Sequence, residues 1–268
     1  MSELIYLDNA ATTKVAPEVY EAMNPYFEEY YGNAASVYRF AGESKKAVEN
    51  ARKEVADFLG AKPNEIYFTG GGSESDNWAL KGLAFSLRNK GKHIITSAIE
   101  HHAILHTCEY LEKLGYEITY VGVDENGILK LDELEKAIRE DTILISVMFA
   151  NNEIGSIQPI KEIGEIAKKH KILFHTDAVQ AYGHVPINVD EYHIDLLSAS
   201  GHKINGPKGI GILCKKWCED RVVRTWWCTG AWKACRYTQY TGYRRLWPCD
   251  NTCKREDGRA YKEGSRAA

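Results

Sequence analysis

Between residue 15 and about residue 213, apolar positions alternate between helical spacing and short, nearly continuous runs. This alternation predicts strand–helix–strand units around a mostly parallel sheet, and therefore an α/β fold. The expected helices span residues 17–30, 43–59, 73–90, 101–114, 131–138 and 160–170. The expected strands span residues 65–69, 93–97, 117–121, 143–149, 172–175, 196–199 and 210–213.

Unusual polar residues follow most of the expected strands. Ligands of such sheets collect at the carboxyl ends of the strands, so these residues are the first candidates for a binding site. Solvation alone does not explain a polar group at successive strand ends. The segments concerned are residues 70–74, 100–102, 151–153, 175–177 and 198–203.

Composition and charge limit the possible partners. The 268 residues are 44% apolar, which is enough to bury the core of one large domain. A formal net charge of −3 gives no reason to expect binding to nucleic acid or to a membrane surface. The longest apolar run, residues 143–150, is too short to span a bilayer, and MSELIYLDNAATT lacks the pattern of a signal peptide. We therefore expect a cytoplasmic protein.

The chain changes character near Cys214. Residues 214–268 contain five of the six tryptophans, six of the seven cysteines and no isoleucine, with no sustained helical or strand period. The spacings Cys214-x3-Cys218 and Cys249-x3-Cys253 leave a zinc module as one alternative, and an aromatic, basic surface for nucleic acid as another. Neither lies within a recognisable fold pattern, so we expect no metal and no nucleic acid.

A glycine-rich turn is the first candidate for chemistry. Gly70, Gly71 and Gly72 lead into Ser73 at an expected helix start, which supplies free backbone N–H groups, a hydroxyl and the positive end of a helix dipole. These groups suit a phosphate. A tight strand-to-helix turn without any ligand is an equally good interpretation of the glycines alone.

Three other positions add to this turn. Asp177 precedes a helical turn with Gln180 three residues later, where a carboxylate can hold a ring nitrogen protonated or simply cap the helix. Lys203 lies between small residues and glycines, where an amine can form a Schiff base with an aldehyde, although most lysines are merely solvated. His101 and His102 suit stacking or proton transfer, or a helix start. Together these groups are the parts that a pyridoxal phosphate site requires.

Six motifs carry a family resemblance. In order, LDNAATT, GGGSESDN, EHHAIL, NNEIG, HTDAVQ and SGHKINGPKGIG resemble those of cysteine desulfurases of the NifS/IscS type, within the class V aminotransferase-like, fold-type I pyridoxal phosphate enzymes. The resemblance covers residues 4–213. It implies an N-terminal arm at residues 1–14 and a cofactor-binding large domain at residues 15–213, with a seven-stranded sheet covered by helices on both faces. Tyr38 departs from the family, in which GNAASVYRFAGE usually carries histidine.

The resemblance indicates which residues would bind the cofactor's aldehyde and phosphate groups. Lys203 would be the Schiff-base lysine. The phosphate would be held by Gly72, Ser73, Ser200 and His202.

The resemblance also indicates which residues would contact the cofactor's ring. Asp177 would pair with the ring nitrogen, and His101 would stack on the ring and move protons. Asn152 and Gln180 would bind the ring hydroxyl. A carboxylate beside the ring nitrogen favours its protonated form, which makes the ring an electron sink.

The activity implied is conversion of L-cysteine to L-alanine, with enzyme-bound sulfur passed to iron–sulfur cluster or thio-cofactor assembly. A homodimer and a sulfur-acceptor or scaffold protein are the implied partners. The family's nucleophilic cysteine and substrate-binding arginine should follow residue 213, and neither can be assigned here. The chain as translated is therefore expected to be inactive; the alternatives are a selenocysteine lyase-like enzyme and a non-catalytic truncated remnant.

A one-nucleotide frameshift near Cys214 accounts for the tail. Trp226-Trp227 must be encoded by TGGTGG, which reads Gly-Gly one nucleotide later. With permitted codons, residues 225–245 then read HGGAQERGRRAGTHNIPGIVG, which contains the family's HGGxQExGxRxGT pattern. We therefore expect residues 214–268 to be an aberrant, disordered tail, with the C-terminal small domain absent.

Overall fold

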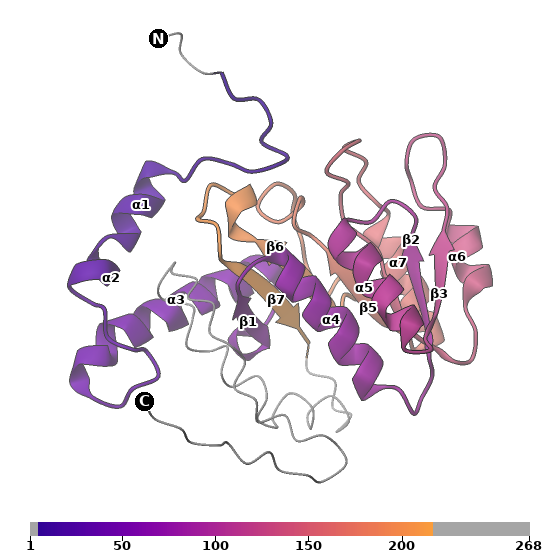
Figure 1. The fold of residues 1–268 in the computed structure, drawn as a ribbon, viewed down its shortest axis with the longest axis horizontal. Helices are drawn as coiled ribbons and strands as arrows, with labels where there is room; N and C mark the ends of the chain where they lie inside the picture. Colours follow the sequence, from indigo (N-terminus) through magenta and orange to yellow (C-terminus); the bar gives the residue numbers. More distant parts are fainter. Residues whose placement is uncertain (1–4, 217–268) are drawn as a thin grey trace, which may run out of the picture.

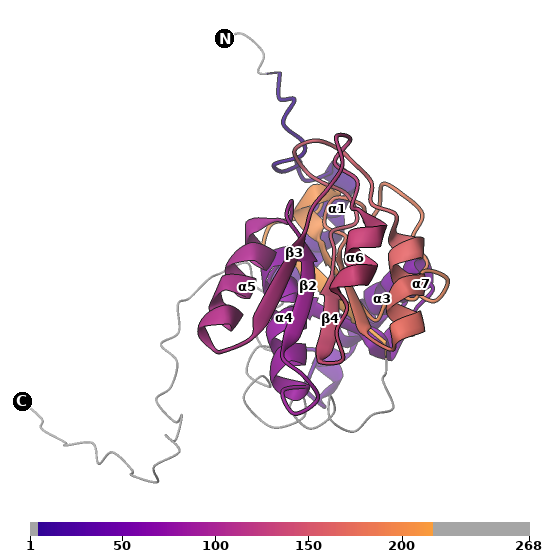
Figure 2. The same cartoon turned by 90° about the vertical axis from the view of Figure 1, so that its right-hand side faces the viewer.

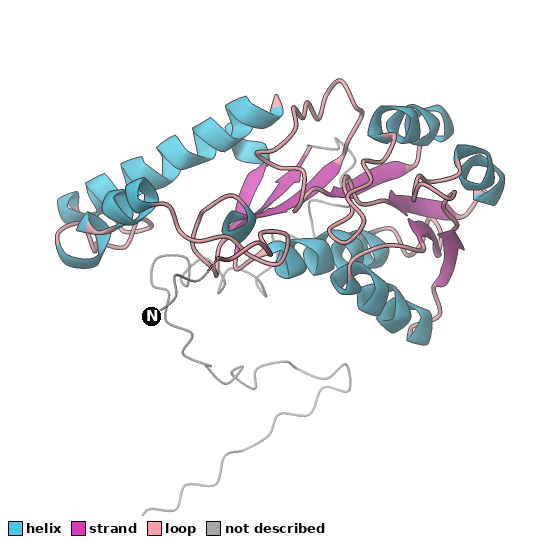
Figure 3. Ribbon diagram, turned by 90° about the horizontal axis from the view of Figure 1, so that it is seen from above, coloured by secondary structure: helices cyan, strands magenta, loops and turns pink. Residues whose placement is uncertain are grey.

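A computed structural model describes residues 5–216, which form one seven-stranded sheet between two layers of helices (Figures 1, 2 and 3). The sheet order is β1-β7-β6-β5-β4-β2-β3. The strands are β1 (Ile66–Thr69), β2 (His93–Ser97), β3 (Glu117–Val121), β4 (Thr142–Ser146), β5 (Leu173–Asp177), β6 (Leu196–Ser200) and β7 (Gly211–Lys215). The predicted α/β class and the seven strands are confirmed.

Strand direction places the carboxyl ends of most strands at one edge of the sheet. Strands β3, β2, β4, β5 and β6 run parallel to one another, as expected for strands joined by crossover helices. Strand β7 runs antiparallel to both β6 and β1, so β1 is parallel to β6. The turn after β1 therefore lies at the same edge as the ends of β5 and β6.

The helices divide between the two faces of the sheet (Figure 2). On one face, α4 and α5 bury a core that includes Leu80, Ile104 and Ile94. On the other, α3, α6 and α7 bury a core that includes Leu59 and Phe174. The bounds are α1 (Pro17–Met23), α2 (Pro25–Glu28), α3 (Gly42–Leu59), α4 (Gly72–Ser86), α5 (His102–Lys113), α6 (Leu131–Ala137) and α7 (Ile160–His170), with short 3-10 turns η1 (Arg39–Ala41), η2 (Pro63–Glu65) and η3 (Gly201–Lys203).

Most predicted elements differ from the structure at one or both ends; the helix expected at 73–90, for example, ends at Ser86. The single helix expected at 17–30 is two short helices, because Pro25 has no N–H to continue the first helix and instead starts the second. The strand expected at 143–149 ends at Ser146, although Val147 and Phe149 still donate backbone hydrogen bonds to β5. The last strand, expected at 210–213, runs through Cys214 to Lys215.

Some predictions fall on residues that the structure does not describe. Those for Cys218, Cys249, Cys253 and the rest of the tail after residue 216 lie outside the described residues. Cys214 lies inside β7, where it is buried opposite Ile66. Among residues 5–216, no helix is long and apolar enough to cross a membrane.

Candidate functional site

The predicted site residues gather around one edge of the sheet. Asp177 is the last residue of β5, and Ser200 is the last residue of β6. The neighbouring turn after β1 leads into α4 at Gly72. Lys203 follows Ser200 in the 3-10 turn η3. The parallel strands thus bring together groups that are more than a hundred residues apart in sequence.

Asp177 is a buried carboxylate that faces positive charge. Its side chain is 5% exposed, and Oδ1 accepts a 2.9 Å hydrogen bond from the backbone N–H of Val179. Burial raises the pKa of Asp177, while the Val179 N–H and the charges of His101 and Lys203 act in the opposite direction. The N–H bond is that of a helix-capping carboxylate, so the capping and the ligand-binding interpretations of this residue are compatible.

His101 begins α5 and lies beside Asp177. Its Nδ1 accepts a 3.1 Å hydrogen bond from the backbone N–H of Ala103, which makes it the N-cap of the helix. A ring nitrogen of His101 and a carboxylate oxygen of Asp177 lie within 4.8 Å of each other and of a carboxylate oxygen of Asp76. The ring is exposed, so it is free to lie against a flat ligand and to exchange protons.

The glycine turn packs closely against β6 and the turn after β5. A Cβ on Gly72 would lie 2.6 Å from Val179 Cγ2 and 3.5 Å from Ser200 Cβ, so a side chain at this position would displace its neighbours. Ser73 follows in the first turn of a 15-residue helix, whose free N–H groups and dipole favour an anion. The structure therefore places Gly72, Ser73 and Ser200 together.

Lys203 is held by the N-terminal arm. Its Nζ donates hydrogen bonds to the carbonyl of Ala10 and, at 3.0 Å, to that of Ala11. Burial lowers the pKa of Lys203, and the charges of Asp177 and Asp8 oppose this shift. A lowered pKa increases the fraction of neutral amine, the form that attacks an aldehyde.

Of the remaining predicted residues, Gln180 lies beside this lysine and His202 precedes it, whereas Asn152 lies in a different turn. Gln180 Nε2 donates to the Ala10 carbonyl at 2.9 Å, so Gln180 and Lys203 share one acceptor. His202 Nδ1 lies 3.1 Å from Thr12 Oγ1, and burial together with the charge of Lys203 lowers its pKa. Asn152 is half-buried in the turn after β4, close in sequence to Phe149, whose N–H bonds the Asp177 carbonyl.

The sequence reasoning missed the role of the arm. Thr13 bonds the His202 carbonyl through both its N–H and its hydroxyl, each at 2.9 Å, and accepts a 2.8 Å bond from the N–H of Asn205. The LDNAATT motif contained the signal, because its consecutive hydroxyl residues lie outside any expected helix or strand. Its residues position the lysine loop.

Two buried carboxyl groups behind the site were also missed. Asp76 in α4 is 1% exposed, and Glu100 just before α5 is 6% exposed. Burial raises the pKa of Glu100 to about 8, against the opposing hydrogen bonds from Ser97 and from the Met148 N–H. Both residues lie in the motifs GGGSESDN and EHHAIL, but their burial is not visible in the sequence.

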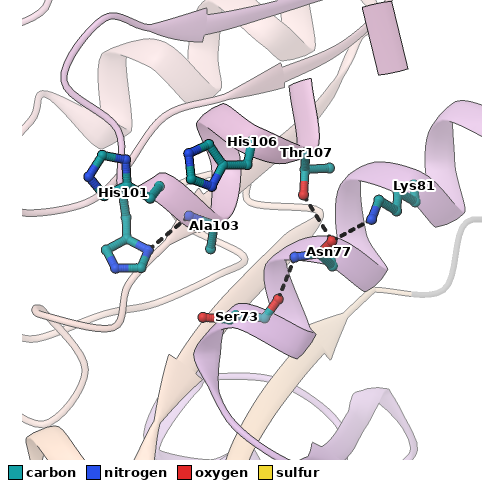
Figure 4. Close-up of a pocket in the computed structure, with 8 residues that line it drawn as sticks. Ser73, Asn77, Lys81, His101, Ala103, His106 and Thr107 are labelled. Atoms are coloured by element: carbon teal, nitrogen blue, oxygen red, sulfur yellow. Dashed lines mark hydrogen bonds between the residues drawn. The ribbon is translucent and has the colours of Figure 1, made fainter. Parts of the chain in front are cut away.

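A surface pocket of about 360 Å³ adjoins the site between α4 and α5 (Figure 4). Asn77 links its walls: it donates to the Ser73 carbonyl at 2.9 Å and accepts from Thr107 and Lys81. The pocket is lined by Ser73, Asn77, Lys81, His101, His102, Ala103, His106 and Thr107. Of the predicted site residues, it reaches only Ser73 and His101.

Known proteins share both the sequence and the fold. The chain is 64% identical over 212 residues to "Cysteine desulfurase IscS" of Methanosarcina thermophila, covering 79% of this chain and 52% of that protein. The protein of the same name from Dictyoglomus turgidum is 58% identical over 213 residues, covering 80% and 54%. The chain thus spans about half the length of these curated relatives.

Two solved structures show the same architecture. "SspA in complex with cysteine" superposes with a TM-score of 0.79 at 44% identity, covering 82% of this chain and 63% of that one. The apo cysteine desulfurase of Thermococcus onnurineus NA1 superposes with a TM-score of 0.74 at 38% identity, covering 80% and 54%. These matches confirm the expected fold-type I architecture and the resemblance to cysteine desulfurases.

The family model for aminotransferase class-V matches residues 5–247, which is most of the sequence. The match includes every segment that contributes to the site described above. The chain therefore belongs to the aminotransferase class-V family.

Proposed function

We propose that residues 5–216 bind pyridoxal 5′-phosphate, with Lys203 as the residue that holds its aldehyde carbon. The observation that supports this most directly is the juxtaposition of a half-buried lysine, a buried carboxylate at Asp177 and the start of a helix at Gly72-Ser73. When bound, this cofactor supplies an electron sink for a substrate carbanion.

The residues present fit the cofactor's chemical groups. Gly72, Ser73, Ser200 and His202 would hold the phosphate, since the turn offers free N–H groups at the start of α4. Asp177 would hold the proton on the ring nitrogen, because a carboxylate at that position favours the charged ring.

The other ring contacts fit as well. His101 would cover the ring and carry protons, and its position within 4.8 Å of the Asp177 carboxylate supports this role. Asn152 and Gln180 would bind the ring hydroxyl, from the turn after β4 and the turn after β5. Each of these groups would act by orienting the cofactor or by moving a proton.

We further propose that the lineage's activity is cysteine desulfuration in the cytoplasm, giving L-alanine and enzyme-bound sulfur for iron–sulfur cluster or thio-cofactor assembly. The relatives named cysteine desulfurase and the structure named as a complex with cysteine support L-cysteine as the substrate. A homodimer and a sulfur-acceptor or scaffold protein would be its partners.

The substitution Lys203→Ala tests the cofactor role. We expect the 268-residue chain mixed with pyridoxal 5′-phosphate to develop a protein-bound yellow absorbance, and Lys203→Ala to lose it. Lys208→Ala is the matched control, since Lys208 is exposed in the same loop. Equal absorbance in the parent and Lys203→Ala would refute the assignment.

Product analysis tests the activity of this chain. We expect little or no alanine from L-cysteine, because the family's nucleophilic cysteine and substrate arginine have no counterpart in residues 5–213 that the motifs identify. Rapid alanine formation by this polypeptide would show that the expectation of inactivity is wrong.

We also propose that the reading frame shifts near Cys214. The support is the codon arithmetic, in which the obligatory TGGTGG of Trp226-Trp227 yields Gly-Gly one nucleotide later. Sequencing the source DNA across this codon tests the proposal. An extra or missing base there supports the frameshift. Activity would require a gene in which the reading frame that encodes the family motifs continues unbroken past this codon.

A further inference from the structure

Three carboxyl groups lie buried together behind the sheet edge. Asp76 projects from α4, Glu100 precedes α5 and Asp177 ends β5. Their exposed fractions are 1%, 6% and 5%. Carboxylate oxygens of Asp76 and Asp177 lie within 4.8 Å of each other. Two negative charges this close in a buried environment disfavour each other, so one group retains a proton.

Asp177, whose pKa burial raises, has neighbours that favour its charged form. It accepts the N–H of Val179, and the positive charge of Lys203 acts on it from the turn after β6. His101 lies within 4.8 Å of Asp76 as well, but among the described residues no lysine or arginine charge acts on Asp76. The group that faces it from β5 at 3.8 Å is His175, and burial lowers the pKa of His175 to about 3, so this ring is neutral.

A chain of hydrogen bonds ends on Asp76. Ser146 Oγ lies 2.9 Å from His175 Nδ1, and His175 Nε2 lies 3.0 Å from Ser198 Oγ. Ser198 in turn bonds the Asp76 carboxyl. In the tautomer that carries the hydrogen on Nε2, the neutral ring accepts from Ser146 and donates to Ser198. The serine hydroxyl then donates to Asp76, a bond that favours the ionised carboxyl and acts against burial.

One oxygen of Asp76 remains without a partner. Among the described residues, Asp76 Oδ1 is fully buried and has no hydrogen-bond partner. An unpaired oxygen of an ionised carboxylate is costly in this position, whereas a carboxylic acid tolerates it better. Burial and the charges of Asp177 and Glu100 raise the pKa of Asp76, and the hydrogen bond from Ser198 acts in the opposite direction.

We propose that Asp76 is a positioning residue that stays protonated beside Asp177, so that the cluster's negative charge rests on Asp177 alone. Asp76 would thereby direct this charge toward His101, Lys203 and the ring nitrogen of the cofactor. The last point rests on the proposed function, whereas the protonation of Asp76 does not.

The variant Asp76→Asn tests the protonation in the full chain without cofactor. Asparagine has the shape of the protonated acid but cannot ionise. A group whose pKa is raised on folding stabilises the protein at low pH, and this contribution is lost as pH rises from the unfolded pKa toward the folded one. Between pH 5 and 7, we therefore expect the folding equilibrium constant of the parent to fall relative to Asp76→Asn, by up to about tenfold per pH unit.

The control is Asp57→Asn, because Asp57 is exposed on α3. Its folding constant should keep a pH-independent ratio to that of the parent. A pH-independent ratio for Asp76→Asn as well would overturn the proposal, since it would mean that Asp76 ionises equally in both states. Urea unfolding at several pH values supplies the constants.

A second measurement covers the case in which Asp76→Asn does not fold. The infrared spectrum of the unmodified chain at pH 7 should contain the C=O band of a protonated carboxyl group. Glu100→Gln removes the carboxyl group whose pKa burial raises to about 8, so a band from Asp76 should persist in that variant. Absence of the band from Glu100→Gln would contradict a protonated Asp76.

Cofactor binding separates this inference from the proposed function. With pyridoxal 5′-phosphate, Asp76→Asn should bind within about threefold of the parent, whereas Asp177→Asn should bind at least about tenfold more weakly, as expected for loss of a hydrogen bond to a charged group. If the parent binds no cofactor, the proposed function fails while the pH result still decides the state of Asp76. If Asp76→Asn weakens cofactor binding as much as Asp177→Asn does, the negative charge is shared between the two carboxyl groups. In that case the inference about Asp76 fails, while the proposed cofactor binding stands.

Discussion

Gly211 illustrates how single residues shape this site. A Cβ at this position would lie 2.6 Å from the carbonyl carbon of Gly71 and 2.8 Å from the carbonyl oxygen of Ala199, and backbone atoms cannot move aside easily. We therefore expect Gly211→Ala to lower the free energy of unfolding by about 1–3 kcal/mol, the usual cost of overpacking. Urea denaturation measures this change.

The matched control is Gly42→Ala at the start of α3. A Cβ there would meet nothing within 4 Å, and alanine favours a helix more than glycine does. Gly42→Ala should therefore leave stability unchanged or raise it by up to about 1 kcal/mol. Equal effects of the two substitutions would contradict the close approach of β7 to the glycine turn.

Individual site residues could be predicted from the sequence where a polar residue followed an expected strand. Asp177, Lys203 and His101 were found in this way, and the structure places them around one edge. Asp76 was not singled out, and Glu100 was noted only as part of segment 100–102, because an acidic residue in or beside a helix is usually solvent-exposed. Only the packing of α4 and α5 against the sheet reveals that they are buried.

At the scale of elements, the N-terminal arm and the 3-10 turn η3 act as one unit. Thr13→Val keeps the shape of the side chain but removes its hydroxyl bonds to the His202 carbonyl and the Asn205 N–H. Each hydrogen bond contributes about 1 kcal/mol. We expect amide hydrogen exchange at Asn205 to become about 5–30-fold faster, while exchange at Leu134 in α6 stays unchanged.

Lys14→Ala is the control for this prediction. The backbone carbonyl of Lys14 accepts a bond from Asn205, but its side chain is exposed. Lys14→Ala should leave exchange at Asn205 as in the parent. Unchanged exchange in Thr13→Val would mean that the arm does not hold the lysine turn.

Element boundaries were predicted well where one pattern persisted. The helix at 160–170 and the strands at 93–97 and 117–121 match the structure residue for residue. The helix expected at 17–30 was too long because apolar spacing continues through Pro25, whereas the missing N–H of proline breaks the backbone hydrogen bonds. At Pro25 the covalent structure of proline therefore decides where the helix ends, although the spacing of apolar residues continues.

At the scale of the whole molecule, chain order predicted the parallel sheet but not the place of its last strand. Alternating strands and helices imply crossovers, which give β2 to β6 their common direction. The antiparallel insertion of β7 between β6 and β1 depends on contacts about 145 residues apart, such as Phe68 with Ile212. No local pattern encodes such a pairing.

Apolar side chains also remain exposed on the whole molecule. Phe27, Tyr31, Val37 and Phe40 lie open on α2 and the segment that leads to α3. The chain spans about half the length of its curated relatives, and an exposed apolar patch of this kind often marks a contact site.

The most direct test of the account is to trap the cofactor on its lysine. The 268-residue chain is incubated with pyridoxal 5′-phosphate, reduced with borohydride so that the carbon–nitrogen bond becomes permanent, digested and analysed by mass spectrometry. We predict that the modified peptide carries its label on Lys203, and that Lys208 stays unlabelled. A label spread over several exposed lysines, or none at all on Lys203, would contradict the assignment of Lys203 as the cofactor lysine.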